Sequence, residues 1–298
     1  MTSDKRSKLK TEMPNSRSST IDQLPIMDIL KLINNEDVTV PIAIRSALKQ
    51  IAQLVEVCVN ALKKNNKVFY IGAGTSGRLG VLDASEIPPT FSAPSEMFTA
   101  IIAGGDNALR SSIEGVEDSM TQSIKDLKDQ KLCNGDVLIG ISASGAAKYV
   151  KSAIDYGKEI GATTAYITCN KNPLYKANQD ILISVETGSE VITGSTRMKA
   201  GTATKLILNM ISTATMVRLG KVYKNLMVDL KVVNEKLVDR GLRIIKEVAK
   251  VDESKAKIAL KDANNSVKHA IIMLKKSCSL LEAKKMINEK EGHLNKVI

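Results

Sequence analysis

Two stretches of this sequence place glycines and hydroxyl groups directly after short apolar runs. They read KVFYIGAGTSG at 67–77 and DVLIGISASG at 136–145. Glycine lets a backbone approach a ligand closely, hydroxyls donate hydrogen bonds, and the start of a helix presents unpaired N–H groups. Such turns can hold an anion, and their hydroxyl content favours a compact sugar phosphate over a dinucleotide. The candidate binding residues are Thr75, Ser76, Ser142 and Ser144.

Carboxylates are the candidates for acid–base chemistry near these turns. Glu86 follows the first turn, and Glu114, Glu117 and Asp118 cluster further along the chain. Glu114 and Glu117 are three residues apart, so they share one face if the segment is helical. Two carboxyl groups in different environments can act as an acid and a base. A solvated helix face is the alternative interpretation of this cluster.

A third segment, TGSTRMKAGTATK at 193–205, places two cations at the start of a predicted helix. Arg197 and Lys199 fall in its first turn, where the helix dipole disfavours positive charge. This placement makes sense if a ligand anion lies at the helix start or if the cations reach another group. Simple capping with surface cations is the alternative.

Short apolar runs alternate with helical patterns in the middle of the chain, which predicts a parallel α/β sheet covered by helices on both faces. Turns at the carboxyl ends of neighbouring parallel strands share one edge of a sheet, so the two glycine-rich stretches should converge on one ligand. The predicted strands are Val68–Ile71, Met97–Ile102, Val137–Ile141, Thr164–Thr168 and Ile181–Val185. The predicted helices cover 42–64, 76–85, 107–128, 146–160 and 198–219, with Pro88-Pro89 stopping the second.

The sequence predicts neither a nucleotide cofactor nor a metal ion. Gly72, Gly74 and Gly77 are one residue short of GxGxxG spacing, and no GxxxxGK[ST] motif occurs. The two histidines, His269 and His293, lie far from the glycine-rich turns, and the four cysteines form no CxxC pair. We therefore expect chemistry that needs no cofactor.

Composition and charge limit the classes of partner. The net charge is +11, but residues 1–20 carry five basic against two acidic residues, and 221–298 eighteen against ten. The excess lies in the tails and the middle is neutral, which argues against a nucleic-acid partner. We expect no membrane partner, because no apolar run approaches a membrane span and the N-terminus has no signal-peptide core. The dispersed cysteines indicate reduced thiols and a cytoplasmic location.

The two ends of the chain differ from its middle. Residues 1–20 are polar and rich in Ser, Lys and Arg, so we expect them to be mobile until a partner or substrate orders them. Beyond Gly220 the pattern is helical, with three short helical stretches over 239–298. We expect a domain boundary near 220–250.

These motifs closely resemble those of the bacterial N-acetylmuramic acid 6-phosphate etherases, a family built on a sugar-isomerase (SIS) type of domain. The resemblance runs from about residue 10 to the C-terminus. The matching segments are INNEDVTVP at 33–41, YIGAGTSGRLGVLDASEIPPTF at 70–91, IIAGGDNALRSSIEGVEDS at 101–119, VITGSTRMKAGTATKLILNMIST at 191–213, NLMVDL at 225–230 and VNEKL at 233–237. A regulatory protein of sugar phosphorylation in animals shares part of the pattern in a longer chain.

The resemblance implies a three-layer α/β sandwich with a five-stranded parallel sheet, plus a small C-terminal helical domain. The implied domains are an N-terminal arm over 1–41, an SIS-type phosphosugar-binding domain over 42–238, and a three-helix, ubiquitin-associated-like domain over 239–298. For this last domain we expect packing or dimer contacts, with a partner-binding site as the alternative. The resemblance also implies a homodimer whose active site lies near the subunit interface.

The implied activity is that of a carbon–oxygen lyase in the recycling of cell-wall amino sugars. It cleaves the D-lactyl ether of N-acetylmuramic acid 6-phosphate by elimination and then hydration, giving N-acetylglucosamine 6-phosphate and D-lactate. By the same resemblance, Glu86 is the acid at the ether oxygen and Glu117 is the base at carbon 2. Sugar and phosphate contacts are expected from Thr75, Ser76, Ser142, Ser144 and Gly145, with Arg197 and Lys199 closing the site.

One loop departs from the family pattern. After SASG the family usually has Arg-Thr-Pro, whereas this chain has Ala146-Ala147-Lys148. Lys148 supplies a charge but lacks the planar fork of arginine. The contacts that this loop makes with a substrate should therefore differ, while the two carboxylates are unaffected.

Two other functions agree with parts of the pattern. An aldose–ketose isomerase for phosphosugars also needs a carboxylate base at carbon 2, and it would release no D-lactate from the muramic substrate. A non-catalytic sugar-phosphate sensor would bind without turnover. No helix-turn-helix segment precedes residue 42 and both acids are present, which argues against the sensor.

Overall fold

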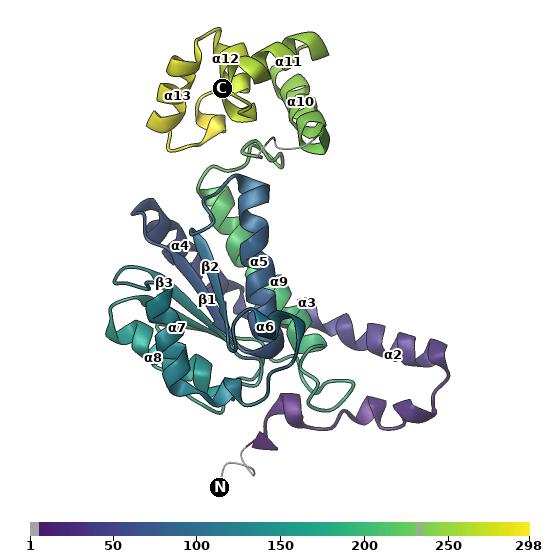
Figure 1. Cartoon of the computed structure of the whole chain (residues 1–298). Coiled ribbons are helices and arrows are strands. Elements are labelled where there is room, and N and C mark those ends of the chain that lie inside the picture. The colour runs from purple at the N-terminus through teal and green to yellow at the C-terminus, as the bar shows by residue number, and fades with distance from the viewer. Residues whose placement is uncertain (1–5, 231, 233–234) are drawn as a thin grey trace. The chain divides into compact units, whose positions relative to one another are not determined.

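The computed structural model, which describes residues 6–230, 232 and 235–298, contains a five-stranded parallel sheet (Figure 1). The strand order is β2-β1-β3-β4-β5, and every neighbouring pair is parallel. The predicted parallel sheet is thus confirmed. The strands are β1 (Val68–Gly72), β2 (Phe98–Ile102), β3 (Val137–Ile141), β4 (Thr163–Thr168) and β5 (Ile181–Ser184).

Helices cover both faces of this sheet, which explains why the strands are continuous apolar runs. On one face, α7 (Met120–Asp129) and α8 (Lys148–Glu159) pack in a cluster with Phe69 and Ile71. Tyr70 points to the other face, where its hydroxyl donates to Asp83 of α5 (3.1 Å). That face also carries α4 (Leu48–Lys63), α5 (Gly74–Phe91) and α9 (Lys199–Arg218).

The predicted stop of α5 at the proline pair is wrong. The helix runs through Pro88 and Pro89 to Phe91. Proline is compatible with helical φ, although it removes a backbone hydrogen bond. Ile87 and Phe91 are buried, so packing of apolar side chains holds this last turn.

The single helix predicted over 107–128 is also wrong. The structure has the short helix α6 (Asn107–Arg110), then a loop, the 3-10 turn Val116–Asp118, and α7. Gly115 has a left-handed φ of 77°, a conformation that interrupts a helix. Glu114 and Glu117 therefore do not share a helix face.

The helix predicted over 42–64 is divided, and a further helix precedes it. The elements are α2 (Ile26–Asp37), α3 (Thr39–Ile44), a 3-10 turn at Arg45–Ala47, and α4. The ends of the other helical predictions, 146–160 and 198–219, agree with α8 and α9 to within two residues.

The described part of the N-terminal arm makes specific contacts, unlike the mobile segment expected for 1–20. The Asn170 amide donates to the hydroxyl of Thr11 (3.0 Å), and the hydroxyl of Ser18 donates to the carbonyl of Val191 (2.7 Å). Thr11 and Ser18 are both buried. The arm is thus tied to the segments that follow β4 and β5.

The chain divides into two compact units, one formed by residues 1–84 and 96–212 and the other by 85–95 and 213–298. Four helices lie in the C-terminal part of the second unit, whereas three were expected: α10 (Glu235–Ala249), α11 (Glu253–Asp262), α12 (Val267–Lys276) and α13 (Leu280–Glu289). The domain limits at 41/42 and 238/239 stay predictions.

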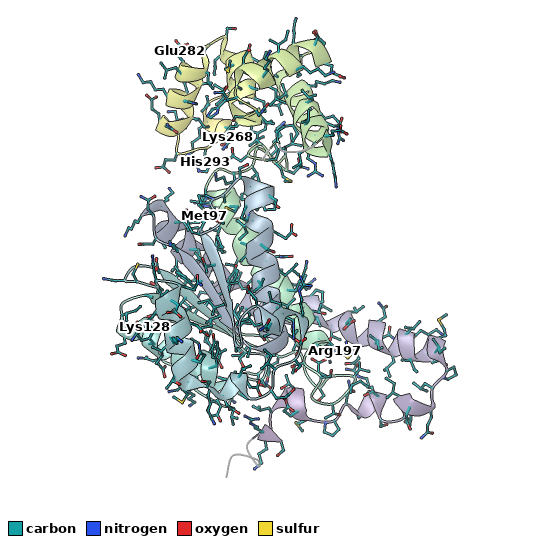
Figure 2. The ribbon with its side chains drawn as sticks, viewed as in Figure 1. Met97, Lys128, Arg197, Lys268, Glu282 and His293 are labelled. Atoms are coloured by element: carbon teal, nitrogen blue, oxygen red, sulfur yellow. The ribbon has the colours of Figure 1, made fainter. Side chains whose placement is uncertain are left out.

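A buried lysine joins three parts of this second unit. The ammonium of Lys268, labelled in Figure 2, donates to the carboxylate of Asp229 (2.6 Å) and to the carbonyls of Gly220 (3.0 Å) and Gly292 (3.1 Å). Burial lowers the pKa of Lys268, and Asp229 opposes that shift. Gly220 has φ +75°, and a Cβ there would lie 2.7 Å from the Gly292 carbonyl carbon.

Candidate functional site

A cavity of about 140 Å³ opens where β1 and β3 end. These two strands are hydrogen-bonded neighbours, and the sheet order reverses between them. Open α/β sheets bind ligands at this switch point, outside the carboxyl ends of the strands. The lining residues are Ala73, Gly74, Thr75, Ser76, Glu117, Ile141, Ser142, Ala143, Ser144, Ala147 and Thr196.

The structure brings the four predicted hydroxyls together in this cavity. Ser76 and Ser142 are only 8% and 6% exposed, so their hydroxyls belong to its walls. The backbone N–H of Ser142 donates to the carbonyl of Ile167 on β4 (3.0 Å), and the Ser144 hydroxyl accepts from the N–H of Ala146 (3.3 Å). Backbone contacts therefore fix the second loop before a ligand arrives.

Glu117 is the carboxylate that lines the cavity. It is exposed and lies on the 3-10 turn Val116–Asp118. Glu114 lines a different cavity, of about 690 Å³, and accepts a hydrogen bond from the hydroxyl of Ser112 (3.0 Å). Of the clustered acids, Glu117 is thus the one placed against the hydroxyls.

The second loop supplies no cation to the cavity. Lys148 pairs with Asp118 (3.4 Å), and Ala147 forms the wall instead. Gly145 does not line the cavity, but it has φ +70° and a Cβ there would lie 2.3 Å from Pro173 Cβ. Its role in this structure is to allow the turn.

The two cations at the start of α9 have different surroundings. Lys199 is 2% exposed and its ammonium lies 2.7 Å from a carboxylate oxygen of Glu36. The N–H groups of Lys199 and Ala200 both donate to the carboxylate of Glu190 (2.9 Å). Burial raises the pKa of Glu190, and these two hydrogen bonds oppose that shift. The helix start is therefore satisfied by protein carboxylates, and the ammonium of Lys199 reaches another group, the carboxylate of Glu36.

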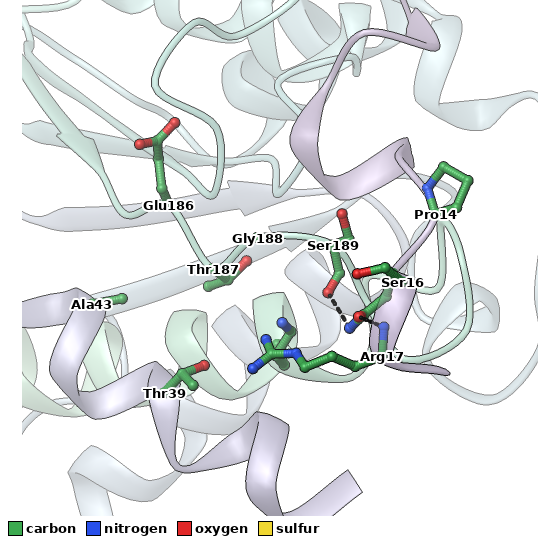
Figure 3. A pocket seen from close by; sticks show the side chains of 11 residues that line it. Pro14, Ser16, Arg17, Thr39, Ala43, Glu186, Thr187, Gly188 and Ser189 are labelled. Carbon is green, nitrogen blue, oxygen red and sulfur yellow. Dashed lines mark hydrogen bonds between the residues drawn. The ribbon is translucent and has the colours of Figure 1, made fainter. Parts of the chain in front are cut away.

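Lys199 instead lines a second cavity, of about 530 Å³, between the N-terminal arm and the segment after β5 (Figure 3). In Figure 3 the side chain of Arg17 extends towards Thr39. Arg17 Nε also lies 2.7 Å from Glu36, so both oxygens of this buried carboxylate are paired. The two cations beside this cavity thus share one carboxylate, and a second carboxylate, Glu186, lines the cavity itself.

Arg197 and Thr196 stand at the turn before α9. Arg197, labelled in Figure 2, is exposed, and its guanidinium makes no hydrogen bond or ion pair with the other described residues. Thr196 lines the hydroxyl-rich cavity, although it is not among the binding residues expected from the sequence. Its position inside the GSTRMK motif was the signal that could have identified it.

Glu86 is exposed on α5 and does not line the cavity. It follows Ser76 by ten residues on the same helix, a rise of about 15 Å. The helix itself is fixed by Asp83, whose buried carboxylate accepts from Tyr70, Asn209 (2.6 Å) and Ser212 (3.1 Å). Burial raises the pKa of Asp83, and these hydrogen bonds oppose the shift.

The described residues contain no group of three or more His, Cys, Asp or Glu side chains that could hold a metal ion. Among the helices that the structure describes, none has the length and apolar character needed to cross a membrane.

The parallel sheet, with a hydroxyl-lined cavity at its switch point, is a domain of the SIS type. Two family profiles match this chain: the glucokinase regulatory protein N-terminal SIS domain over residues 50–158, and the C-terminal lid domain of glucokinase regulatory protein over residues 224–267. A solved structure of a phosphoheptose isomerase from Francisella tularensis shares the fold, with a TM-score of 0.52 and 19% identity over 65% of this chain and all of that one.

Curated relatives define the family more narrowly. N-acetylmuramic acid 6-phosphate etherases from Oceanobacillus iheyensis and Bacillus licheniformis are 51% and 49% identical to this chain, each over 97% of it and over 98% and 95% of their own lengths. One from Actinobacillus pleuropneumoniae is 46% identical over 98% of this chain and 96% of its own. The chain belongs to the N-acetylmuramic acid 6-phosphate etherase family.

Proposed function

We propose that this protein cleaves the lactyl ether of N-acetylmuramic acid 6-phosphate, giving N-acetylglucosamine 6-phosphate and D-lactate. The observation that carries the proposal is the convergence of four hydroxyls and Glu117 on one cavity at the switch point of the sheet. Relatives that match nearly the whole chain and are named N-acetylmuramic acid 6-phosphate etherase support the choice of substrate.

The hydroxyls and the start of α5 would hold the phosphate. Thr75 and Ser76 lie in the first turn of α5, where free N–H groups and the helix dipole favour an anion. Ser142 and Ser144 add donors from the neighbouring loop. Arg197 has an exposed guanidinium that makes no bond with other described residues and can close over the ligand, whereas we assign Lys199 to pairing with Glu36.

Glu117 would be the base. In the open-chain sugar the aldehyde at carbon 1 makes the proton on carbon 2 acidic. Glu117 takes this proton, the freed electron pair forms the double bond between carbons 2 and 3, and the bond from carbon 3 to the lactyl oxygen breaks. A carboxylic acid protonates the departing oxygen, and water then adds at carbon 3 while a proton returns to carbon 2.

Glu86 would supply that acid from a second copy of the chain. It is absent from the cavity of its own chain, and Leu82, one turn earlier on the same face of α5, is an exposed apolar side chain. The α2–α3 segment exposes Ile26, Met27, Leu30, Val38 and Ile42. Exposed apolar groups of this kind mark interaction surfaces, and a homodimer would cover them.

We also propose a cytoplasmic location. All four cysteines are free thiols, and Cys58 and Cys169 are buried. Burial raises the pKa of each of these two thiols to about 12, which keeps them protonated and unreactive.

Incubation with N-acetylmuramic acid 6-phosphate tests the proposed reaction. We expect stoichiometric D-lactate and N-acetylglucosamine 6-phosphate. A ketose phosphate in place of D-lactate would identify an isomerase, and tight binding without turnover would identify a sensor.

A further inference from the structure

Arg78 joins the two halves of the proposed site. It lies on α5, two residues after Ser76, and its guanidinium donates two hydrogen bonds to main-chain oxygens. Nε donates to the carbonyl of Leu109 (3.1 Å) and Nη2 to the carbonyl of Ser111 (3.1 Å). Both acceptors lie at the end of α6, in the segment that leads to Glu117.

Between these carbonyls and Glu117, Val116 packs against the cluster that contains residues of α7 and α8, while the polar contacts of the segment are few. Residues 111–115 are exposed, and Gly115 takes a left-handed conformation. On the far side of Glu117, the ion pair between Asp118 and Lys148 is exposed at 3.4 Å, and such pairs contribute little. Arg78 is therefore the firmer of the two charged contacts that hold the segment carrying Glu117.

We infer that Arg78 is a positioning residue that sets the distance between Glu117 and the phosphate-binding hydroxyls. This inference rests on the proposed roles of Glu117 and Ser76. Because Arg78 and Ser76 share α5, the guanidinium transmits the position of the bound phosphate to the base loop through a rigid helix. Arginine suits this task, since its planar fork can satisfy two carbonyls in one fixed geometry while lysine presents a single rotating ammonium. The positive charge also lies at the carboxyl end of α6, where it is favoured.

The test compares Arg78→Lys with wild type in three measurements: D-lactate kcat, exchange of the carbon 2 proton with solvent deuterium, and inhibition by inorganic phosphate. We expect kcat and exchange to fall together by about 10- to 100-fold, as for a misplaced catalytic group. The inhibition constant for phosphate should change less than about twofold, because the hydroxyls stay in place. Arg110→Gln is the matched control, since Arg110 is exposed on α6 and makes no side-chain bond with the described residues.

A second variant distinguishes loss of the guanidinium group from misfolding. Arg78→Ala should be partly restored in kcat by added guanidinium ion and not by ammonium ion, with no change in phosphate inhibition. Rescue by both ions, or by neither in a folded variant, overturns the inference.

Other outcomes separate this inference from the proposed function. Phosphate inhibition that weakens in proportion to kcat/KM would make Arg78 a ligand-binding residue and overturn the positioning role. In a Glu117→Gln background, Arg78→Lys should cause no further loss, and a further loss overturns the inference while leaving the reaction intact. Normal exchange in Glu117→Gln alone would instead overturn the role proposed for Glu117.

Discussion

Glu117 is exposed and shares its cavity with five hydroxyl side chains, so its chemistry depends on these neighbours and on the bound substrate, not on burial. Glu117→Gln keeps the size of the side chain and removes its basicity. We expect exchange of the carbon 2 proton to fall by about 10²–10⁴-fold, the usual contribution of a general base, with phosphate inhibition retained. Deuterium incorporation followed by NMR measures this. Loss of exchange in Glu114→Gln, together with normal exchange in Glu117→Gln, would move the role to Glu114.

Asp180 gives a pH-dependent contribution to stability. Burial alone would raise its pKa, but hydrogen bonds from Lys158 and from the N–H and hydroxyl of Thr164 (2.9 and 3.0 Å) lower it overall. A carboxyl with a lowered folded pKa stabilises the protein above its unfolded value of about 3.9, and this stabilisation is lost as pH falls through the folded pKa.

Asp180→Asn should accordingly lower the free energy of unfolding by about 1–3 kcal/mol at pH 7 and by less near pH 3. Urea unfolding at both pH values measures the difference. Asp22→Asn, at an exposed aspartate with no hydrogen bond among the described residues, should show neither effect. An equal loss for Asp180→Asn at both pH values would contradict the assignment.

Residue types and spacing predicted Thr75, Ser76, Ser142 and Ser144 because each lies within four residues of a strand end, which is a local feature, whereas Thr196 precedes a helix and was missed. The partner of Lys199 could not be predicted in this way. Glu36 is 163 residues away, and only the fold, which places the end of α2 beside the start of α9, brings the two charges together. Glu114 and Glu117 were indistinguishable until the left-handed Gly115 separated their directions.

At the scale of elements, the turn from β1 into α5 depends on Gly77. A Cβ there would lie 2.6 Å from Ile102 Cγ1 and 2.8 Å from the Gly72 carbonyl oxygen. Gly77→Ala should cost about 1–3 kcal/mol of stability and weaken phosphate binding, because the helix start must shift.

Gly105→Ala is the control for this substitution. Gly105 has φ +66°, and a Cβ added there would meet open space. The substitution should therefore cost about 1–2 kcal/mol of stability from backbone strain alone and leave phosphate binding unchanged. Thermal unfolding and phosphate competition measure both variants. Wild-type phosphate binding in Gly77→Ala would show that the turn tolerates a side chain.

The strands were predictable because buried parallel strands are short continuous apolar runs, and each prediction agrees with the structure to within one residue at either end. The limits of the helices were less predictable from the sequence. The continuation of α5 through Pro88 and Pro89 depends on burial of Ile87 and Phe91, which local propensity does not contain. Likewise, the fixed contacts of the arm depend on Asn170 and Val191, both distant in sequence.

At the scale of the whole molecule, a shared active site can be tested by mixing subunits. If Glu86 acts in the cavity of the partner, Glu86→Gln and Glu117→Gln dimers are each inactive, but a mixed dimer contains one intact site. Random reassembly of equal amounts should recover about a quarter of wild-type activity, since half the dimers are mixed and each has one of two sites. No recovery in mixed dimers verified by mass would place Glu86 and Glu117 of one chain in the same site.

The contacts of Lys268 have a consequence for where the chain can be shortened. Its ammonium holds the carbonyl of Gly292, and Leu294 just beyond is fully buried. The last residues are therefore part of the core of their unit. Ending the chain at Glu291 would leave a buried ammonium short of an acceptor and open an apolar gap, so we expect the melting temperature to fall.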